Sequence, residues 1–239
     1  MLLFYVRHGE PIYDPDSLTE TGLKQAEALS KRFALFGLDK IYSSTSNRAV
    51  LTAEPTAKRL GLSIEKLPWC HEGLVAREFN PYKENEGWTW CFSHAPTVRL
   101  FRSNEVKKLG DKWYDHPAFS DLLYKEGVLR VNKETDEFLN SLGFTHDREN
   151  RVYRKNQNPT PERVALFAHQ GFSMAFLSSL MDIPYPEYCT RHDLGHSSVT
   201  VIDFHEWDGV FIPRFLQVSN DAHVYKAGLP LFYNHEYEF

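Results

Sequence analysis

Short apolar runs and stretches of helical periodicity alternate along most of the chain. The first run, Met1–Val6, is apolar throughout and predicts a buried strand. A loop over residues 7–18 follows, and apolar residues then recur at helical spacing over residues 20–36. Thr19 is suited to the N-cap of this helix and Gly37 to its C-terminal stop. The chain therefore begins with a strand, a loop and a helix.

The same order repeats further along the sequence. Residues 40–43 predict a second strand and residues 46–60 a second helix, with Pro55 inside it. Residues 63–67 are a candidate third strand. This repetition is typical of an α/β protein, in which helices connect the strands of one sheet.

The order returns near the C-terminus. Residues 164–168 form another continuous apolar run, and residues 171–182 predict the helix after it. Two further strands are expected over residues 198–204 and 211–218, joined by a turn at residues 207–209. We therefore expect a mostly parallel sheet covered by helices on both faces, with one antiparallel pair near the C-terminus.

The middle of the chain has a different character. Residues 79–127 mix charges and aromatic residues with little periodicity, and a helix is expected over residues 130–142. Residues 145–161 are polar and contain prolines, which predicts an exposed loop. No clean linker interrupts the chain, so we expect a single domain over residues 1–239 with an inserted, partly helical cap at about 79–145. Its aromatic residues are candidates for the core of the insertion or for a lid over a substrate pocket; they are Trp88, Trp90, Phe92, Phe101, Trp113 and Tyr114.

Composition narrows the class of protein. The 239 residues are 42% hydrophobic and 25% charged, as in ordinary globular proteins, and the net charge of −5 argues against a general nucleic-acid binder. The three cysteines form no C-x-x-C pair, which favours reduced thiols in a cytoplasmic protein. No apolar run approaches the length of about 18 residues needed for a membrane span, and the N-terminus has no basic lead-in of a signal peptide.

Two predicted strands end in a histidine that is closely followed by a glycine. They are Val6-Arg7-His8-Gly9 and Ala168-His169-Gln170-Gly171, and a third strand runs into the segment 43–48, which ends at Arg48. Ligand sites of open α/β sheets lie outside the carboxyl ends of the strands, so these three loops should converge. Guanidinium groups bind phosphoryl oxygens in a fork, and a neutral histidine nitrogen can attack phosphorus. The pattern therefore indicates phosphoryl chemistry.

The motifs as a set resemble the histidine phosphatase superfamily, the phosphoglycerate mutase-like proteins. The resemblance is dense over residues 1–60 and returns over residues 164–204. Four segments carry it in order: Arg7-His8-Gly9-Glu10, Leu18-Thr19-x-x-Gly22-x-x-Gln25-Ala26, Ser43-Ser44-x-x-x-Arg48-Ala49-x-x-Thr52-Ala53 and Ala168-His169. The resemblance implies a three-layer α/β/α sandwich and no metal or organic cofactor.

The resemblance also implies roles for individual residues. His8 is the expected phosphate acceptor, and Arg7, Arg48 and His169 are the expected phosphate pocket. The family usually has a carboxylate shortly after the third strand that protonates the leaving oxygen. Glu72 fits this position best, and Glu78 is the alternative, although a solvated charge is the simpler interpretation of Glu78.

Three more positions are candidates for contact with phosphate or substrate. Gln170 follows His169 directly, and His196 precedes the strand at 198–204. Asp14 stands where the family often has an asparagine, and a carboxylate there would repel a dianion unless it turned away.

The departure from the family pattern at Asp14 favours a phosphatase over a mutase. We expect a histidine acid-type phosphatase that acts on a small phosphate ester and resolves a phosphohistidine with water. A phosphoglycerate-type mutase and a catalytically weak phospho-ligand-binding protein are the alternatives. The expected partner is a small molecule and neither nucleic acid nor a membrane, whereas the physiological substrate and the oligomeric state are not encoded in any motif.

Overall fold

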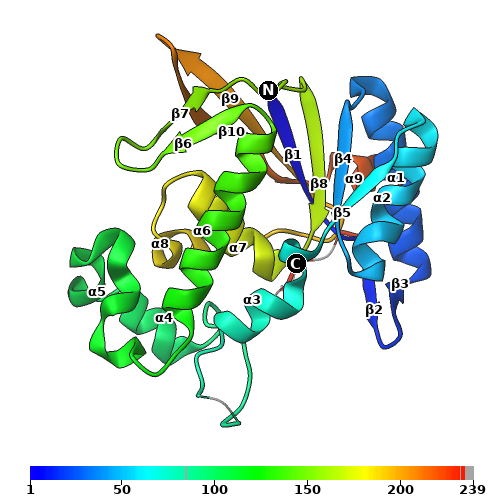
Figure 1. Cartoon of the computed structure of the whole chain (residues 1–239). Coiled ribbons are helices and arrows are strands. Elements are labelled where there is room, and N and C mark those ends of the chain that lie inside the picture. Colours follow the sequence, from blue (N-terminus) through cyan, green and yellow to red (C-terminus); the bar gives the residue numbers. More distant parts are fainter. Residues whose placement is uncertain (84, 232, 235–239) are drawn as a thin grey trace.

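A mixed sheet forms the centre of the molecule in this computed structural model, which describes residues 1–83, 85–231 and 233–234 (Figure 1). Within these residues the sheet has eight strands in the order β5-β4-β8-β1-β9-β10-β7-β6. The strands are β1 (Leu2–Arg7), β4 (Lys40–Ser44), β5 (Ile64–Leu67), β6 (Phe144–Asp147), β7 (Val152–Lys155), β8 (Arg163–Ala168), β9 (Val199–Trp207) and β10 (Val210–Asn220). A separate hairpin pairs β2 (Pro11–Tyr13) with β3 (Asp16–Leu18).

Helices cover both faces of the sheet. The helices of the described chain are α1 (Glu20–Phe36), α2 (Asn47–Leu60), α3 (Glu72–Glu78), α4 (Ala95–Phe101), α5 (Asn104–Lys108), α6 (Tyr124–Ser141), α7 (Gln170–Leu180), α8 (Tyr185–Cys189) and α9 (Ala222–Lys226). Short 3₁₀ turns occupy Pro68–Cys70, Gly110–Asp115 and Pro117–Phe119. In Figure 1, α1 and α2 lie on one side of the sheet and α6 and α7 on the other.

The alternation of side chains along β1 shows why the layers form. Phe4 and Val6 pack into one hydrophobic cluster with Phe33 of α1, whereas Leu3 and Tyr5 pack into another with α7. Successive strand residues point to opposite faces, so one apolar strand supplies both cores. This arrangement confirms the expected α/β class with helices on both faces.

The helix boundaries expected from capping residues are close to those observed. The Thr19 side chain accepts a hydrogen bond from the Gly22 amide at the start of α1, and Gly37 and Gly61 follow α1 and α2. Pro55 lies within α2, which continues through it.

Two expectations about strands are wrong. The sheet is not mostly parallel, because only the pairings among β5, β4, β8 and β1 are parallel, whereas β1–β9, β9–β10, β10–β7 and β7–β6 are antiparallel. Residues 145–161 are not simply a loop, because β6 and β7 form a hairpin at the sheet edge. Edge strands face solvent and so have few apolar residues; here Phe144 and Tyr153 supply the buried side chains.

The segment between β5 and β6 carries the helices that lie farthest from α1. Figure 1 shows α4 and α5 beyond α6, away from the sheet. Helix α6 begins six residues earlier than the sequence predicted, at Tyr124. No helix in the described part of the chain combines the length and apolarity that crossing a bilayer requires.

Candidate active site

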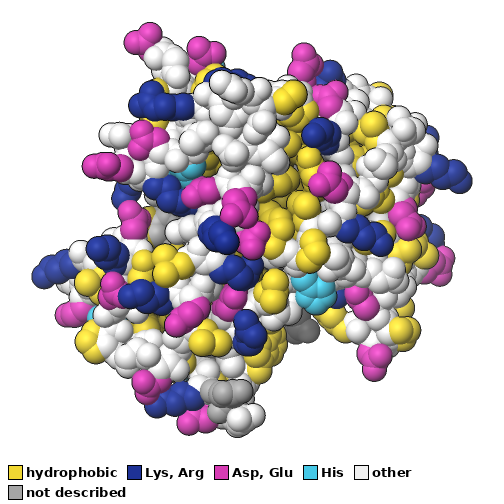
Figure 2. All heavy atoms as spheres, viewed as in Figure 1, with side chains coloured by type: hydrophobic (Ala, Val, Ile, Leu, Met, Phe, Trp, Pro, Cys, Tyr) yellow, Lys and Arg dark blue, Asp and Glu magenta, His cyan; other side chains and the backbone are white. Residues whose placement is uncertain are grey.

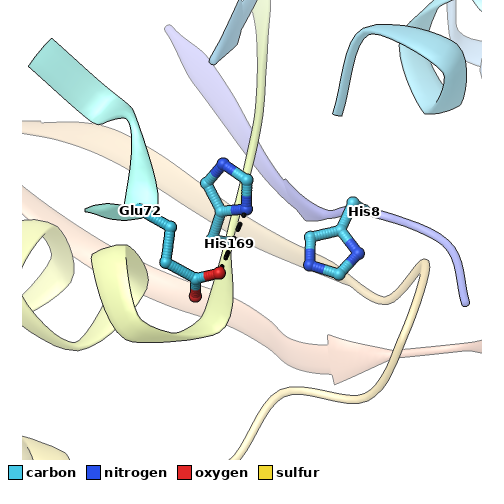
Figure 3. Close-up of side chains that lie close together, drawn as sticks. All are labelled: His8, Glu72 and His169. Atoms are coloured by element: carbon cyan, nitrogen blue, oxygen red, sulfur yellow. Dashed lines mark ion pairs between the residues drawn. The ribbon is translucent and has the colours of Figure 1, made fainter. Parts of the chain in front are cut away.

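The carboxyl ends of β1 and β8 bring the two predicted histidines together. These strands are parallel neighbours, with Arg7 opposite Ala168, so the next residue of each enters the same space. The rings of His8 and His169 are 5.3 Å apart between centroids, and both side chains are buried. Figure 3 shows them beside Glu72, which comes from the first turn of α3.

His8 is held in the form that a nucleophile requires. Its Nδ1 lies 2.7 Å from the Gly9 carbonyl oxygen, which can only accept, so Nδ1 carries the hydrogen and Nε2 keeps its lone pair. Burial, reinforced by the Arg7 charge, holds the pKa of His8 well below its ordinary value. The imidazole is therefore neutral at neutral pH.

Arg7 is buried beside His8 and fixed by several acceptors. Its Nη1 donates to Gln170 Oε1 at 2.8 Å, to Asn234 Oδ1 at 2.7 Å and to the Leu194 carbonyl oxygen. Its Nη2 donates to His196 Nε2 at 2.9 Å. Burial and the Arg7 charge lower the pKa of His196 to about 3, so His196 is a neutral acceptor. Burial lowers the pKa of Arg7 from its ordinary value, but a guanidinium stays protonated at neutral pH.

Arg48, at the start of α2, joins the other groups. Its Nη2 donates to Glu72 Oε2 at 2.8 Å and to His169 Nδ1 at 3.2 Å. Because a guanidinium only donates, His169 accepts through Nδ1 and donates from Nε2 to Ser44 Oγ at 2.8 Å. Burial and the Arg48 charge hold the pKa of His169 well below its ordinary value.

Both guanidinium groups retain an unused donor. Arg7 Nε and Arg48 Nε are buried, and neither has a hydrogen-bond partner among the described residues. Buried polar groups without partners are uncommon in folded proteins, and oxyanions are the natural acceptors for guanidinium donors. This pair of donors favours an anionic ligand.

The two candidate acids have different surroundings. Glu72 borders the cavity at His8, and its Oε1 accepts a hydrogen bond from the Gly171 amide at 3.1 Å. Glu78 is buried and receives two hydrogen bonds of 2.6 Å from Arg130. The interpretation of Glu78 as a solvated charge is wrong, and its position inside an ion pair does not place it in the site.

The structure corrects the assignment of Asp14 to the phosphate pocket. Asp14 lies in the exposed turn between β2 and β3, outside the residues that line the cavity. The acid that reaches the site from this hairpin is Asp16, whose Oδ1 accepts from Arg48 Nη1 at 2.8 Å. Tyr13 also lines the cavity, and Arg48 lies 5.3 Å from the centre of its ring.

Several residues of the site were not predicted from the sequence. Ser44 could have been found, because it ends β4 next to β8. Asp16 has no such signal, and neither does Asn234, whose amide contacts Arg7 and Gln170 from the far end of the chain. The predicted candidates Gln170 and His196 do lie beside Arg7.

A cavity of about 1010 Å³ opens from His8 and Arg48. Some aromatic residues of the insertion belong to its core, and others border the cavity. Phe101 and Trp113 are buried in the core, whereas a second group lines the cavity: Trp88, Trp90 and Phe92.

Three side chains of the candidate active site also have the spacing of a metal site. Ligand atoms of His8, Glu72 and His169 lie within 4.8 Å of one another, a spacing that a metal ion could use. Arg48 contacts both Glu72 and His169, however, and the Arg7 charge acts directly on His8. A cation would be repelled by these guanidiniums, whereas an oxyanion would be attracted.

Comparisons with known proteins agree with this geometry. Residues 3–99 match the family model of the histidine phosphatase superfamily (branch 1). The curated protein named "Putative phosphoserine phosphatase 2" from Hydrogenobacter thermophilus is 27% identical over 153 residues, which are 60% of this chain and 68% of that protein.

Solved structures show the same fold. A phosphoserine phosphatase mutant from Entamoeba histolytica, in complex with phosphoserine, is 18% identical with a TM-score of 0.57, covering 93% of this chain and 98% of that one. A mycobacterial glucosyl-3-phosphoglycerate phosphatase, complexed with VO3, is 20% identical with a TM-score of 0.56, covering 90% and 97%. The resemblance found in the sequence motifs is confirmed.

Proposed function

We propose that this chain is a member of the histidine phosphatase superfamily and hydrolyses small phosphate monoesters through a phosphohistidine at His8. The observation that carries the proposal is the hydrogen bond from His8 Nδ1 to the Gly9 carbonyl oxygen, beside two buried guanidiniums. It leaves Nε2 as an unprotonated nucleophile next to donors suited to a phosphoryl group.

The reaction has two displacement steps. His8 Nε2 attacks phosphorus, the P–O bond to the alcohol breaks, and Glu72 supplies the proton that the leaving oxygen takes up. Glu72 then removes a proton from water, which attacks phosphorus and breaks the P–N bond, releasing inorganic phosphate and neutral His8. Arg7 and Arg48 donate to the phosphoryl oxygens, whose negative charge they stabilise in both transition states, and His169 completes the phosphate pocket by accepting from Arg48 through Nδ1.

Two features support finer points of the proposal. The lowered pKa of His8 keeps the nucleophile neutral in mild acid, which supports the histidine acid-type class. The aromatic side chains at the cavity support a cap role for the segment at about 79–145 within a single domain. The names of the relatives favour a small phosphorylated metabolite as substrate.

The test compares wild type with His8→Ala on 4-nitrophenyl phosphate. Losing the nucleophile should reduce kcat by at least about 10³-fold. The control is His205→Ala, a partly exposed histidine of β9 that should retain wild-type activity. After acid quench of wild type, mass spectrometry should find one phosphoryl group on the peptide containing His8. Equal activity of His8→Ala in a folded protein would refute the proposal.

Following the fate of the phosphoryl group in the same assay separates a hydrolase from a mutase and from a binding protein. A mutase would deliver the phosphoryl group to an acceptor hydroxyl, whereas a hydrolase releases inorganic phosphate into water. A binding protein would show a phosphorylated or occupied site without turnover. The sequence feature that favoured this last alternative was Asp14, which lies outside the cavity.

A further inference from the structure

The cavity is much larger than a phosphoryl group requires. Its volume of about 1010 Å³ lies at the upper end of the usual range for small-molecule pockets. Most of this space lies beyond the phosphoryl-binding groups and is available to the leaving group. The residues that line it therefore define the class of alcohol that fits.

One wall of the cavity is a row of aromatic rings, which we call the aromatic wall: Trp88, Trp90 and Phe92. Trp90 stacks on Phe92 with centroids 5.3 Å apart and planes 12° apart, and Trp88 meets Trp90 edge-on at 5.4 Å. Cys91, between the last two rings, is fully buried with its Sγ 3.3 Å from the Tyr185 hydroxyl. This anchor, together with the ring packing, holds the aromatic wall in place.

The aromatic wall begins beside the proposed acid. Trp88 Nε1 donates to the Ala76 carbonyl oxygen at 3.0 Å and so ties the aromatic wall to α3, the helix that starts at Glu72. The Trp90 ring covers Gly171 so closely that an added Cβ would lie 2.1 Å from Cη2. The Gly171 amide binds Glu72, so the rings lie next to the point where the leaving oxygen receives its proton.

Charged side chains also line the cavity. Beyond Arg7 and Arg48, the described lining residues include one more guanidinium, Arg191. Arg191 donates to Glu187 at 2.8 Å, and Glu187 also accepts from Arg102 at 2.7 Å. The lining also contains the carboxylate Asp193 and the histidines His71 and His192. Arg191 and Arg102 share the single carboxylate of Glu187, so this part of the lining does not exclude a charged leaving group.

The exposure of Trp88 indicates which group the aromatic wall accepts. Its side chain is 57% exposed although it lines a cavity next to reactive groups. An indole face that is orientationally fixed and open to solvent gains free energy when a planar apolar ring covers it. An alkyl chain or a small sugar acid would cover less of this surface.

We propose that the preferred substrates are phosphate monoesters of ring-bearing alcohols, whose ring packs against Trp88 and Trp90. This inference rests on the proposed function and specifies its substrate class. It departs from phosphoserine, the ligand named for one structural neighbour, because that compound has no ring.

The test uses two esters that differ mainly in the ring. 2-Phenylethyl phosphate and propyl phosphate both release primary alcohols of similar acidity, so the ratio of their kcat/KM values reports recognition rather than leaving-group reactivity. Wild type should favour the phenylethyl ester by about tenfold, and should favour it over phosphoserine as well. Trp88→Ala should lower the phenylethyl-to-propyl ratio by about fivefold.

The matched control is Trp207→Ala. Trp207 is 55% exposed, close to Trp88, but it ends β9 at the turn to β10 and does not line the cavity. Its removal should leave the ratio unchanged. The inference is overturned if wild type shows no preference, if phosphoserine is the better substrate, or if folded Trp88→Ala keeps the wild-type ratio.

Binding separates this inference from the proposed function. Calorimetric titration of His8→Ala with the same two esters measures the ring preference without turnover. Tighter binding of the phenylethyl ester, lost in a variant that also carries Trp88→Ala, supports the inference even if no ester is hydrolysed. Equal binding of the two esters overturns it whether or not hydrolysis occurs.

Discussion

Glu72 and Glu78 stand at opposite ends of one short helix and have opposite surroundings. Glu72 borders the cavity and shares Arg48 with His169, whereas Glu78 is enclosed with Arg130. Sequence position favoured Glu72, which follows the third strand more closely than Glu78 does. The choice of Glu72 agrees with its place in the cavity, and its role as proton donor stays a prediction.

Replacing Glu72 tests that role through the leaving group. Glu72→Gln removes the proton donor, so an alkyl phosphate, whose alkoxide leaves poorly, should lose about 10²–10⁴-fold in kcat/KM. 4-Nitrophenyl phosphate needs little protonation and should lose far less. The steady-state rates of the two substrates give the measurement. An equal loss on both would contradict a general-acid role.

The matched control is Glu78→Gln. It leaves Arg130 without its carboxylate partner in a mostly buried position, so the free energy of unfolding should fall by about 2 kcal/mol. The ratio of the two rates should stay at the wild-type value, because Glu78 lies outside the lining of the cavity.

Asp14 and Asp16 show that the sequence could not predict which acid of this segment contacts Arg48. Both belong to the β2–β3 hairpin: Asp14 lies in its turn, whereas Asp16 begins β3 and accepts from Arg48. The sequence pattern identified His8, Arg7, Arg48 and His169 because strand ends place them together, and the structure brings these four side chains to one cavity or its edge. The hairpin has no apolar pattern that could have revealed its register.

At the scale of elements, the β6–β7 hairpin was missed although it packs closely on the molecule. His146 of β6 is enclosed, with Nδ1 2.8 Å from Asp136 of α6 and Nε2 2.9 Å from Asp182 after α7. Its ring also stacks on Tyr153 of β7 at 4.0 Å. A histidine between two acids holds this edge hairpin to two helices, which no local pattern in a polar segment could show.

The hydrogen bonds of His146 to Asp136 and Asp182 predict a pH-dependent contribution to the free energy of unfolding. Burial alone would lower the pKa of His146, but the hydrogen bonds to Asp136 and Asp182 outweigh it and raise the pKa above its ordinary value. A raised pKa in the folded state means that the contribution is complete below about pH 6.5 and is lost as pH rises through the raised value. His146→Phe keeps a ring on Tyr153 but loses both hydrogen bonds.

Urea unfolding across this pH range gives the measurement. Near pH 6 the variant should be about 2 kcal/mol less stable than wild type, a value reduced from that of a fully buried pair because Asp136 is one-third exposed. The difference should shrink as pH rises. His205→Phe, at a partly exposed histidine, is the control. A constant difference between His146→Phe and wild type at every pH would contradict an ionic interaction of His146 with the two aspartates.

At the scale of the whole molecule, the net charge of −5 concealed a cationic pocket at the end of a mixed sheet. Figure 2 shows acidic and basic side chains interspersed over the viewed face, without a large area of one sign. The alternation of strands and helices predicted the α/β class because local periodicity encodes it. The antiparallel half was underestimated, because strand direction depends on connections that periodicity does not describe.

The buried histidines predict a further property of the whole fold, a loss of stability in mild acid. Burial lowers the pKa of four histidines of the described chain: His8, His169, His196 and His223. The value is about 3 for His196 and about 4 for His223. Below about pH 6.5 these histidines become protonated in the unfolded chain but stay neutral in the folded protein. The free energy of unfolding therefore decreases as the pH is lowered, by at most about 1.4 kcal/mol per pH unit for each group.

Urea unfolding between about pH 7.5 and about pH 5.5 tests this property, since most carboxyls titrate below that window. The slope is taken in the part of this window below about pH 6.5, because the His146 contribution is complete there and no longer opposes the trend. His223→Gln removes one of the four groups and should flatten the slope, whatever its effect at neutral pH. A free energy of unfolding that stays constant across the window would mean that these histidines gain protons in the folded state, which would also remove the basis for a neutral nucleophile at His8.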